Sequence, residues 1–436
     1  MTTSTLNRRG FLQGSAAVIG LTAAGRAPAF AQGTKLHMVR WVDFIPEADV
    51  ELKRQAPEAS KALGAEVTFE FINANDLQPR ITAAIQSGSG ADIFQMLYNW
   101  PQLYANGLVD VSDVAEAVAK AQGGFYDAFP AACKVGGKWL AVPHSTGGNA
   151  VAWRKSWHAE IGITEFPKTM DAWREVGKKL KAKGKPVGQA LGHSFGDPPT
   201  FAYPLLWSFG GAETDPSGKK VILNSKGTLE SLKFMQAFWK DACDEGGLAW
   251  DDTNNNRAFH AGEISSTLNG ASIYIVAKRQ KDKIKDEKGE PLYLDIDHAA
   301  PLPAGPAGQA ALYVPFQHAV MKHSRNVKLA KDLLTWLHQK ENYGKWFEVN
   351  EGYSVGAAKA WEEHPMWARV DKPLQVFRRA ARQTKMLGYQ GPATAKATES
   401  YSKYIIVDMY AKAVQGGQAE DALKWAEAEL KKIYEG

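Results

Sequence analysis

Short apolar runs alternate with amphipathic segments through the first part of the chain. Apolar strands are predicted over residues 35–42, 66–72 and 93–97, and a helix with Leu77 and Ile81 on one face lies between the last two. Strands that alternate with helices indicate a parallel sheet covered on both faces, with ligands beyond the carboxyl ends of the strands. The polar and aromatic side chains that follow these strand ends are Trp41, Asp43, Asn73, Asn75, Tyr98, Asn99 and Trp100.

Residues 136–180 carry the most informative pattern of the sequence. A glycine pair leads into a short apolar strand over 139–142, which Pro143 is expected to end, and a second apolar run covers 150–153. Thr169 then marks the start of a helix with an apolar stripe. Two apolar strands joined by an extended polar link are typical of a chain that crosses from one domain to another, and we expect such a crossing here.

The rest of the chain continues this alternation. Strands are expected over 186–191 and 313–321, and further crossings over 295–303 and 348–356. The C-terminal segment is expected to be helical, with an apolar stripe over 423–433 that faces the core of the second domain. The pattern therefore predicts an α/β chain of two domains that are linked by several crossings.

Length and composition restrict the class of protein. At 436 residues the chain is long enough for two domains, and its 44% hydrophobic and 23% charged residues are those of a soluble globular protein. The formal charge is +5, but loss of a segment containing Arg8, Arg9 and Arg26 would leave 49 basic against 47 acidic residues. So small an excess is not that of a nucleic-acid-binding protein, and we expect no nucleic-acid partner.

The first 31 residues are interpreted as an export signal. Arg8 and Arg9 precede a weakly apolar run, and residues 29–31 (Ala-Phe-Ala) form a small-x-small site for cleavage after Ala31. The arginine pair resembles that of twin-arginine signals. Because the apolar run is too short and too rich in glycine and alanine to span a bilayer, we expect the mature chain to be free in the periplasm.

Two cysteines, Cys133 and Cys243, lie far apart in the sequence and in different predicted domains. An oxidising compartment would permit a disulfide between them, whereas their small and apolar neighbours favour buried single thiols. Both alternatives stay open, with the thiols favoured. The histidines show no His-Glu-x-x-His or similar spacing, so we expect neither a metal site nor another cofactor.

The order and spacing of these motifs resemble those of the family 1 extracellular solute-binding proteins, the periplasmic receptors of ATP-driven sugar importers. The resemblance rests on the run at 136–180, on Gly-Ser-Gly-Ala-Asp before the third strand, and on a Phe- and Gly-containing helix-to-strand segment at 258–270. It covers nearly all of residues 33–436. The sequence departs from the family at Trp153-Arg154, where Tyr-Asn is usual, and these departures weaken any ligand role there.

This resemblance implies a two-lobed α/β fold of the type II, maltose-binding-protein-like class, and a binding protein rather than an enzyme. Lobe one would comprise residues 33–143 and 300–345, and lobe two residues 144–299 and 346–436. The ligand would be a sugar-like solute such as a mono- or oligosaccharide, a polyol or a glycoside. The partner would be the permease of an ABC transporter, and the protein would act as a monomer without a cofactor.

Side chains from both lobes are expected to contact the solute. A pyranose presents apolar C–H faces that stack on aromatic rings, and hydroxyls that need donors and acceptors. The candidate ligand-binding residues are Trp41, Asp43, Asn75, Tyr98, Asn99, Trp100, His144, Asn149, Tyr203, Asn269, Gly270, Ser272, Gln317 and Tyr353. Two alternatives stay open, because Trp41 and Trp100 could be core residues and His144 could be a hydrogen-bonding residue of the hinge.

A competing hypothesis is a periplasmic serine esterase. Residues 192–196 (Gly-His-Ser-Phe-Gly) match the nucleophile elbow of the α/β-hydrolases, with Ser194 as the nucleophile. An elbow needs a buried strand that runs directly into a helix, whereas Pro198 and Pro199 are expected to delay the helix to about Thr200. The esterase is therefore the weaker of the two hypotheses.

Overall fold

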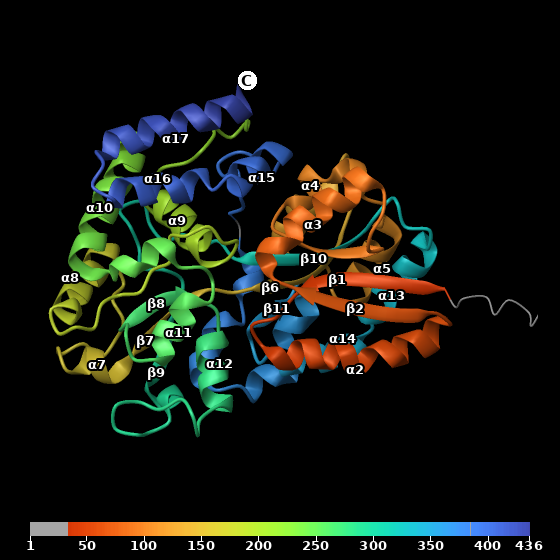
Figure 1. Ribbon diagram of the computed structural model, residues 1–436, viewed down its shortest axis with the longest axis horizontal. Helices are drawn as coiled ribbons and strands as arrows, with labels where there is room; N and C mark the ends of the chain where they lie inside the picture. The colour runs from red at the N-terminus through yellow and green to blue at the C-terminus, as the bar shows by residue number, and fades with distance from the viewer. Residues whose placement is uncertain (1–33, 384) are drawn as a thin grey trace, which may run out of the picture.

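The computed structural model describes residues 34–383 and 385–436, which fold around two separate β-sheets. The larger sheet contains β1 (Lys35–Trp41), β2 (Glu66–Ile72), β3 (Ile93–Leu97), β6 (Val142–Gly147), β10 (Val314–Val320) and β11 (Ser354–Gly356), in the order β11-β6-β10-β3-β1-β2. Figure 1 shows this sheet in one half of an elongated molecule and the smaller sheet in the other half. The expected export signal, with its cleavage site after Ala31, lies outside the described residues.

The larger sheet combines parallel and antiparallel pairs. β1 pairs in parallel with β2 and β3, whereas β10 runs antiparallel to β3 and β6, and β11 antiparallel to β6. β3 and β10 are buried throughout, although β3 contains Gln95 and β10 contains Gln317 and His318. The crossover helices α2 (Pro46–Leu63) and α3 (Ala74–Ser87) lie on opposite sides of the sheet (Figure 1). Its other helices are α4 (Trp100–Leu103), α5 (Ser112–Ala121), α6 (Ala128–Cys133), α13 (Val327–Leu337) and α14 (Lys340–Val349), and a hairpin of β4 (Lys134–Val135) and β5 (Lys138–Trp139) stands beside them.

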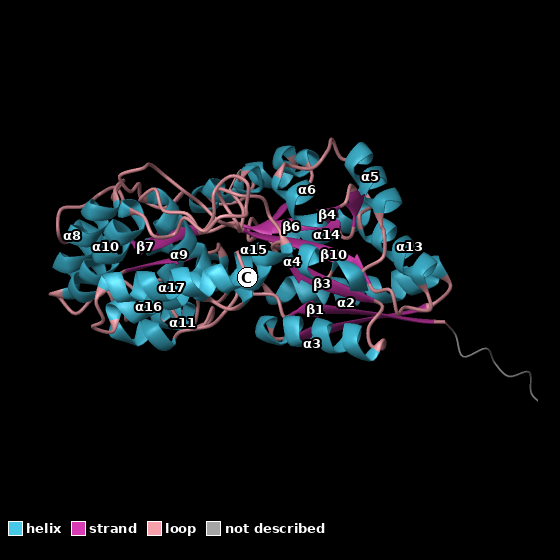
Figure 2. Ribbon diagram, turned by 90° about the horizontal axis from the view of Figure 1, so that it is seen from above, coloured by secondary structure: helices cyan, strands magenta, loops and turns pink. Residues whose placement is uncertain are grey.

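The smaller sheet is antiparallel, with β7 (Ala150–Arg154) between β8 (Ser266–Asn269) and β9 (Ile296–Ala299). Helices surround these strands in Figure 2. They are α7 (Lys155–Ala159), α8 (Met170–Lys181), α9 (Asp197–Ser208), α10 (Lys226–Ala242), α11 (Asn254–His260) and α12 (Ser272–Arg279), and the C-terminal α16 (Ile405–Val414) and α17 (Ala419–Tyr434) pack on α10. The start of α8 confirms the sequence prediction, because the Thr169 side chain caps it by accepting the N–H of Ala172 at 3.2 Å.

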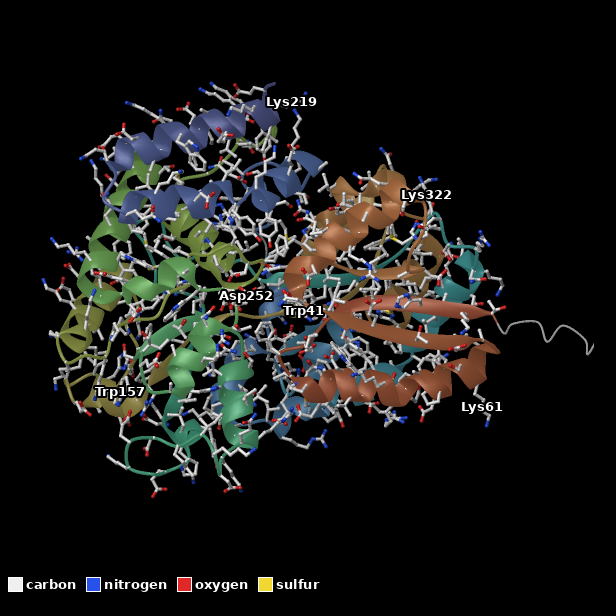
Figure 3. All side chains as sticks on the ribbon, viewed as in Figure 1. Trp41, Lys61, Trp157, Lys219, Asp252 and Lys322 are labelled. Atoms are coloured by element: carbon white, nitrogen blue, oxygen red, sulfur yellow. The ribbon has the colours of Figure 1, made fainter. Side chains whose placement is uncertain are left out.

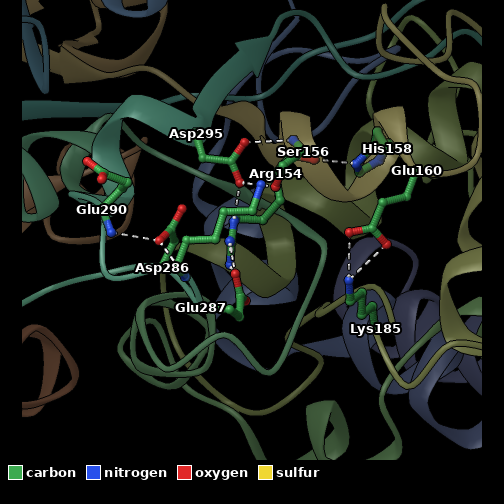
Figure 4. Close-up of polar contacts among 10 residues, drawn as sticks. Arg154, Ser156, His158, Glu160, Lys185, Asp286, Glu287, Glu290 and Asp295 are labelled. Carbon is green, nitrogen blue, oxygen red and sulfur yellow. Dashed lines mark hydrogen bonds and ion pairs between the residues drawn. The ribbon is translucent and has the colours of Figure 1, made fainter.

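A buried ion cluster anchors the end of β7 (Figure 4). The side chain of Arg154 is 0% exposed; its Nε donates to Asp295 Oδ2 at 2.7 Å and its Nη2 to Glu287 Oε2 at 2.8 Å. Ser156 donates from both its N–H and its hydroxyl to the same Asp295 carboxylate. Because a buried cation is tolerated only when paired, Arg154 joins β7 to the segment after α12 and has a structural role.

The chain leaves the larger sheet later than the sequence predicts. Pro143 does not end a strand, because β6 continues to Gly147 and passes through it. β11 pairs only with residues 145–147 of β6, so the missing N–H of Pro143 breaks no hydrogen bond to that strand. β11 itself belongs to the larger sheet, which places the chain with that sheet up to Gly356 rather than to residue 345.

Two further expectations concern residues 186–191 and the cysteines. Residues 186–191 form only two isolated bridges, from Val187 to Cys243 and to Ser266, because Pro186 lacks a backbone N–H and Gly188 lacks a side chain that could pack. Cys133 and Cys243 are both buried free thiols, as the favoured alternative expects. None of the described helices is long and apolar enough to cross a membrane.

Candidate functional site

A cleft lies between the two halves of the molecule, where β1 ends. In this closed arrangement it encloses a volume of only about 30 Å³. We call it the inner cleft, and its lining residues are Trp41, Phe44, Gly147, Gly148, Asn149, Gly196, Asp197, Asp252, Asn269, Gly270, Ser272, Val314, Phe316 and Tyr353. An adjoining outer cavity of about 310 Å³ shares Phe44 and Asp252 with it. Figure 3 shows Trp41 and Asp252 on either side of the boundary between the halves.

Aromatic rings form one wall of the inner cleft. Trp41 ends β1, and its ring centroid lies 4.7 Å from that of Phe316 on β10 and 5.8 Å from that of Phe44. The Phe44 ring lies 6.0 Å from the ring of Tyr353, which precedes β11. Tyr353 in turn covers Gly270 on the opposite wall, where an added Cβ would come within 3.1 Å of its ring. The wall offers flat apolar faces together with one phenolic hydroxyl.

Asp252 joins several parts of the opposite wall through hydrogen bonds. Its Oδ1 accepts hydrogen bonds from Ser194 Oγ at 2.6 Å and from the N–H of Asp197 at 2.7 Å, and its Oδ2 accepts the N–H of Gly196 at 2.9 Å. A Cβ at residue 196 would come within 2.8 Å of this carboxylate, so the turn requires glycine. Burial raises the pKa of Asp252, although these donors oppose the shift.

Asp197 lies at the start of α9 beside Asp252. Its Oδ2 accepts the side-chain N–H of Asn255 at 2.6 Å and that of Asn269 at 3.3 Å. Asn269 Oδ1 accepts the hydroxyl of Ser272 at 3.2 Å. Burial, and then the negative charge of Asp252, raise the pKa of Asp197 well above its ordinary value. This side of the cleft is therefore a connected network of carboxylates, amides and a hydroxyl.

Asp43 is a third buried carboxylate, and it lines the outer cavity. Its Oδ1 accepts the N–H of Ile45 at 2.9 Å, and its own N–H donates to Asp49 Oδ2 at 3.0 Å. Burial raises the pKa of Asp43 to about 7, Asp49 adds to the rise, and the buried cation of Arg40 opposes it. The Arg40 guanidinium is directed to His318, whose Nε2 lies 2.6 Å from Arg40 Nη1.

The structure brings eight of the sequence-predicted site residues to these two spaces. Those that line the inner cleft are Trp41, Asn149, Asn269, Gly270, Ser272 and Tyr353. Asp43 and Asn75 line the outer cavity. The predicted residues that line neither space are Tyr98, Asn99, Trp100, His144, Tyr203 and Gln317.

Three of these six residues lie instead where the two halves touch. Tyr98 donates its hydroxyl to the carbonyl of Phe195 at 2.8 Å, and the ring of Trp100 lies 5.2 Å from that of Phe195. Asn99 donates to the carbonyl of Thr394 at 3.3 Å. All three are fully buried, so the alternative expectation that Trp100 is a core residue agrees with its position.

The other three residues are buried away from the cleft. His144 packs between the rings of His318 and Trp346, each with its centroid at 4.4 Å. Tyr203 is directed to Glu213 at 3.4 Å. Gln317 donates to the carbonyl of Tyr98, because side chains alternate along β10 and its neighbour Phe316 is the one that faces the cleft.

Sequence reasoning missed several cleft residues. Phe44 follows Asp43 in the same strand-end loop, and Phe316 could have been found by applying the strand alternation to 314–320 in both registers. Asp197 and Asp252 gave no comparable signal. They meet because a glycine-containing turn folds back over a separate segment, and sequence spacing does not record that contact.

Ser194 does not belong to a nucleophile elbow. Residues 188–193 form no strand, so no strand runs into the helix. The predicted delay of the helix was wrong, because α9 begins at Asp197 and not near Thr200; prolines are tolerated in a first helical turn. The Ser194 hydroxyl donates to Asp252, and the neighbouring His193 lies 2.7 Å from Asp408 Oδ1. Ser194 therefore helps to hold the turn at residues 194–197 against the Asp252 carboxylate.

Several contacts join the halves around the cleft. The carbonyl of Phe195 in the second half accepts a hydrogen bond from Tyr98 in the first half, and it also accepts one from Tyr401 on α15 (Ala395–Ser402) within its own half. On another side, Arg279 at the end of α12 pairs with Glu47 on α2 and with Glu351 Oε1 at 2.8 Å. These contacts describe a closed arrangement of the two halves.

One histidine cluster has a geometry that metal ions use elsewhere. His144, His318 and His338 offer ring nitrogens that all lie within 4.8 Å of one another. However, Arg40 faces His318 Nε2, and the two nitrogens of His338 lie against the carbonyls of Leu334 and Pro143. Burial lowers the pKa of all three imidazoles. A guanidinium beside the cluster and carbonyls on one ring are a poor fit for a cation.

Comparison with known proteins identifies a family that matches most of the chain. The model of the bacterial extracellular solute-binding proteins matches residues 48–344. The chain is 28% identical over 342 residues to a probable ABC transporter-binding protein of Deinococcus radiodurans, covering 74% of this chain and 76% of that protein. It is 27% identical over 195 residues to the diacetylchitobiose binding protein DasA of Streptomyces coelicolor, covering 42% and 43% of the two chains.

Solved structures of low sequence identity share the fold. Maltose-bound MalE3 of T. maritima has a TM-score of 0.75 at 21% identity and covers 92% of this chain and 100% of its own. A Thermotoga lettingae solute-binding protein with bound α-D-tagatose has a TM-score of 0.78 at 16% identity, with the same coverage. The predicted maltose-binding-protein-like architecture is thus confirmed.

Proposed function

This chain belongs to the bacterial extracellular solute-binding proteins, and we propose that it captures a carbohydrate or sugar-like solute in the inner cleft and delivers it to the permease of an ABC transporter. The observation that supports a sugar most directly is the pairing of opposite walls. Trp41, Phe44 and Phe316 supply faces for a sugar ring, while Asn269 and Ser272 supply groups for its hydroxyls. Proteins of the same fold bind maltose, tagatose and laminaribiose.

Capture requires the two lobes to close on the solute. Strand pairing supports a first lobe that includes β6 to Gly147 and β10 to β11, and a second lobe that includes β7 to β9 and the C-terminal helices. A ligand that touches Trp41 and Asn269 together binds the closed state more tightly than the open state, so it shifts the equilibrium towards closure. The permease would then read a surface composed of both closed lobes.

The proposed location follows from the arginine pair near the N-terminus. Export of the folded protein by the twin-arginine route, with cleavage after Ala31, would place a monomeric receptor in the periplasm. Membership of a family of extracellular binding proteins agrees with export. It also agrees with a role in binding rather than catalysis.

The experiment that tests sugar capture is a thermal-shift screen followed by titration calorimetry. Neutral sugars and polyols such as maltose, tagatose, laminaribiose and ribitol are compared, because a solute that binds the folded state raises the melting temperature. For the best ligand, Trp41→Ala should weaken binding by about 1 to 3 kcal/mol through lost stacking and apolar burial.

Trp336→Ala is the matched control, because Trp336 lies on α13 and outside the cleft. It should leave the affinity unchanged. Equal losses of affinity in the two variants would contradict stacking at Trp41, and a screen without any sugar or polyol ligand would contradict the proposed function.

A further inference from the structure

The charges that line the ligand spaces are all of one sign. Asp197 and Asp252 line the inner cleft, and Asp43, Asp251 and Asp252 line the outer cavity. Among the described residues, no lysine, arginine or histidine lines either space. The chain as a whole has slightly more basic than acidic residues, so the one-sided lining does not follow from composition.

Neighbouring cations compensate these carboxylates poorly. The charge of Arg40 acts on Asp43, but Arg40 Nη1 lies against His318, and the charge of Lys53 acts on Asp49. Asp197 and Asp252 receive hydrogen bonds from uncharged donors alone, namely amides, N–H groups and the Ser194 hydroxyl. Buried carboxylates without a cation are unfavourable in their charged form.

The side chain of Tyr353 lies near several of these carboxylates. Its pKa is raised well above the ordinary value by burial first, and then by the charges of Asp43, Asp197 and Asp252. Tyr353 lines the inner cleft and faces Phe44, so the field and the aromatic wall occupy the same space. Aromatic faces together with carboxylates form the surroundings that ammonium groups prefer, because both attract a cation.

We propose that the cleft selects a solute that carries a protonated amine, an amino sugar or an amino polyol, over the neutral and acidic solutes of the same carbon skeleton. The inference rests on the proposed function and narrows its ligand class. The ammonium group lies between the aromatic wall and the pair Asp197 and Asp252. Its positive charge there compensates the negative charge of carboxylates that closure separates from water. An acidic sugar would bring a further negative charge to the same place and is rejected.

The test uses matched ligands on the full mature protein. Glucosamine, glucose and glucuronate form one set, galactosamine, galactose and galacturonate a second, and the β-1,4 dimer of glucosamine with cellobiose a third. Affinities are measured by calorimetry at about pH 6.5, where an alkylammonium remains protonated. The amine of at least one set should bind about tenfold or more tightly than its neutral parent.

Variants connect the preference to the carboxylates. Asp197→Asn keeps the shape and an acceptor for Asn255, and it should lower the amine-to-neutral affinity ratio by about tenfold. Asp43→Asn provides a second variant should the first fail to fold. Asp282→Asn makes the same change at an exposed position outside both spaces and should leave the ratio as it is.

The outcomes separate this inference from the proposed function. If the amine binds more tightly than its neutral parent in none of the three sets, or if an acidic sugar binds best, the amine preference is overturned and sugar capture stays in place. An amine preference that persists in both carboxylate variants also overturns it. Binding of no member of any set, and of none of the neutral solutes in the earlier screen, overturns both.

Discussion

Replacing Asp43 by asparagine should stabilise the ligand-free protein, and the gain should grow with pH. Asp43 is buried in the closed arrangement, and burial raises its pKa to about 7 from the ordinary value of 3.8. Asparagine keeps the Oδ1 acceptor for the N–H of Ile45 and carries no charge at any pH. Its new N–H₂ group can also donate to Asp49, which lies close enough to bond the Asp43 backbone.

The magnitude follows from proton linkage. Between pH 3.8 and about 7 the folded protein binds more protons at Asp43 than the unfolded chain does, so the free energy of unfolding falls as pH rises through this window. The loss is complete above about pH 7. A shift of about 3 units corresponds to about 4 kcal/mol, which is an upper limit, since opening of the cleft hydrates the carboxylate without unfolding.

Two measurements show how much of the free-energy cost of the buried Asp43 charge appears as easier unfolding and how much as opening of the cleft. Urea unfolding of Asp43→Asn and of the parent gives the difference between their free energies of unfolding at about pH 4 and pH 8. The difference should be near zero at about pH 4, and the variant should be the more stable protein at about pH 8. Small-angle scattering under the same conditions gives the radius of gyration. The parent should expand more than the variant as pH rises.

The comparison must be made as variant minus parent, because Asp49, Asp197 and Asp252 also have a raised pKa and add to the pH dependence of both proteins. Asp282→Asn serves as the control at an exposed position and should show no pH-dependent difference. A stability difference that is the same at both pH values would refute the argument, because it would show that folding does not raise the pKa of Asp43.

Three further predictions concern other parts of the chain. Arg279→Ala removes ion pairs between the lobes, so it should weaken solute affinity about threefold to tenfold. The melting temperature of the ligand-free protein should change little. An affinity that calorimetry finds unchanged would contradict a role of Arg279 in closure. Arg154→Ala leaves Asp295 without its cation and should lower the unfolding free energy by about 3 kcal/mol or more in a urea titration, while a loss under 1 kcal/mol would argue against a structural ion cluster. Changing Arg8 and Arg9 together to lysine should leave precursor in the cytoplasm, and normal periplasmic accumulation in cell fractions would exclude the twin-arginine route.

Much of the fold could be predicted from local patterns. β2 and β3 begin and end at the predicted residues, and α8 starts after Thr169 as the capping pattern indicates. Such features depend on side chains that are near one another in the sequence, so hydrophobic periodicity and capping residues are enough to find them. Trp41 and Asp43, at and just after the carboxyl end of β1, could be located for the same reason.

The sequence was less informative where two segments must meet. Pro143 was expected to end a strand, but its effect depends on how far β11 extends along β6, which is a property of the pairing. Tyr98, Asn99 and Trp100 follow a strand end as predicted, yet the closed lobes bury them against Phe195 and Thr394. A strand-end position therefore predicts the edge of the sheet and does not predict what covers it.

The sequence by itself determined the α/β class, the number of lobes and a resemblance that the family match confirms. Only the tertiary structure decided which face of β10 lines the inner cleft, with Phe316 rather than Gln317, and that Asp252 lies beside Asp197. The physical reason is that secondary structure is encoded by neighbours along the chain, whereas a binding cleft is formed by residues from distant segments. Their charges become unfavourable, and therefore selective, only when folding removes water from around them.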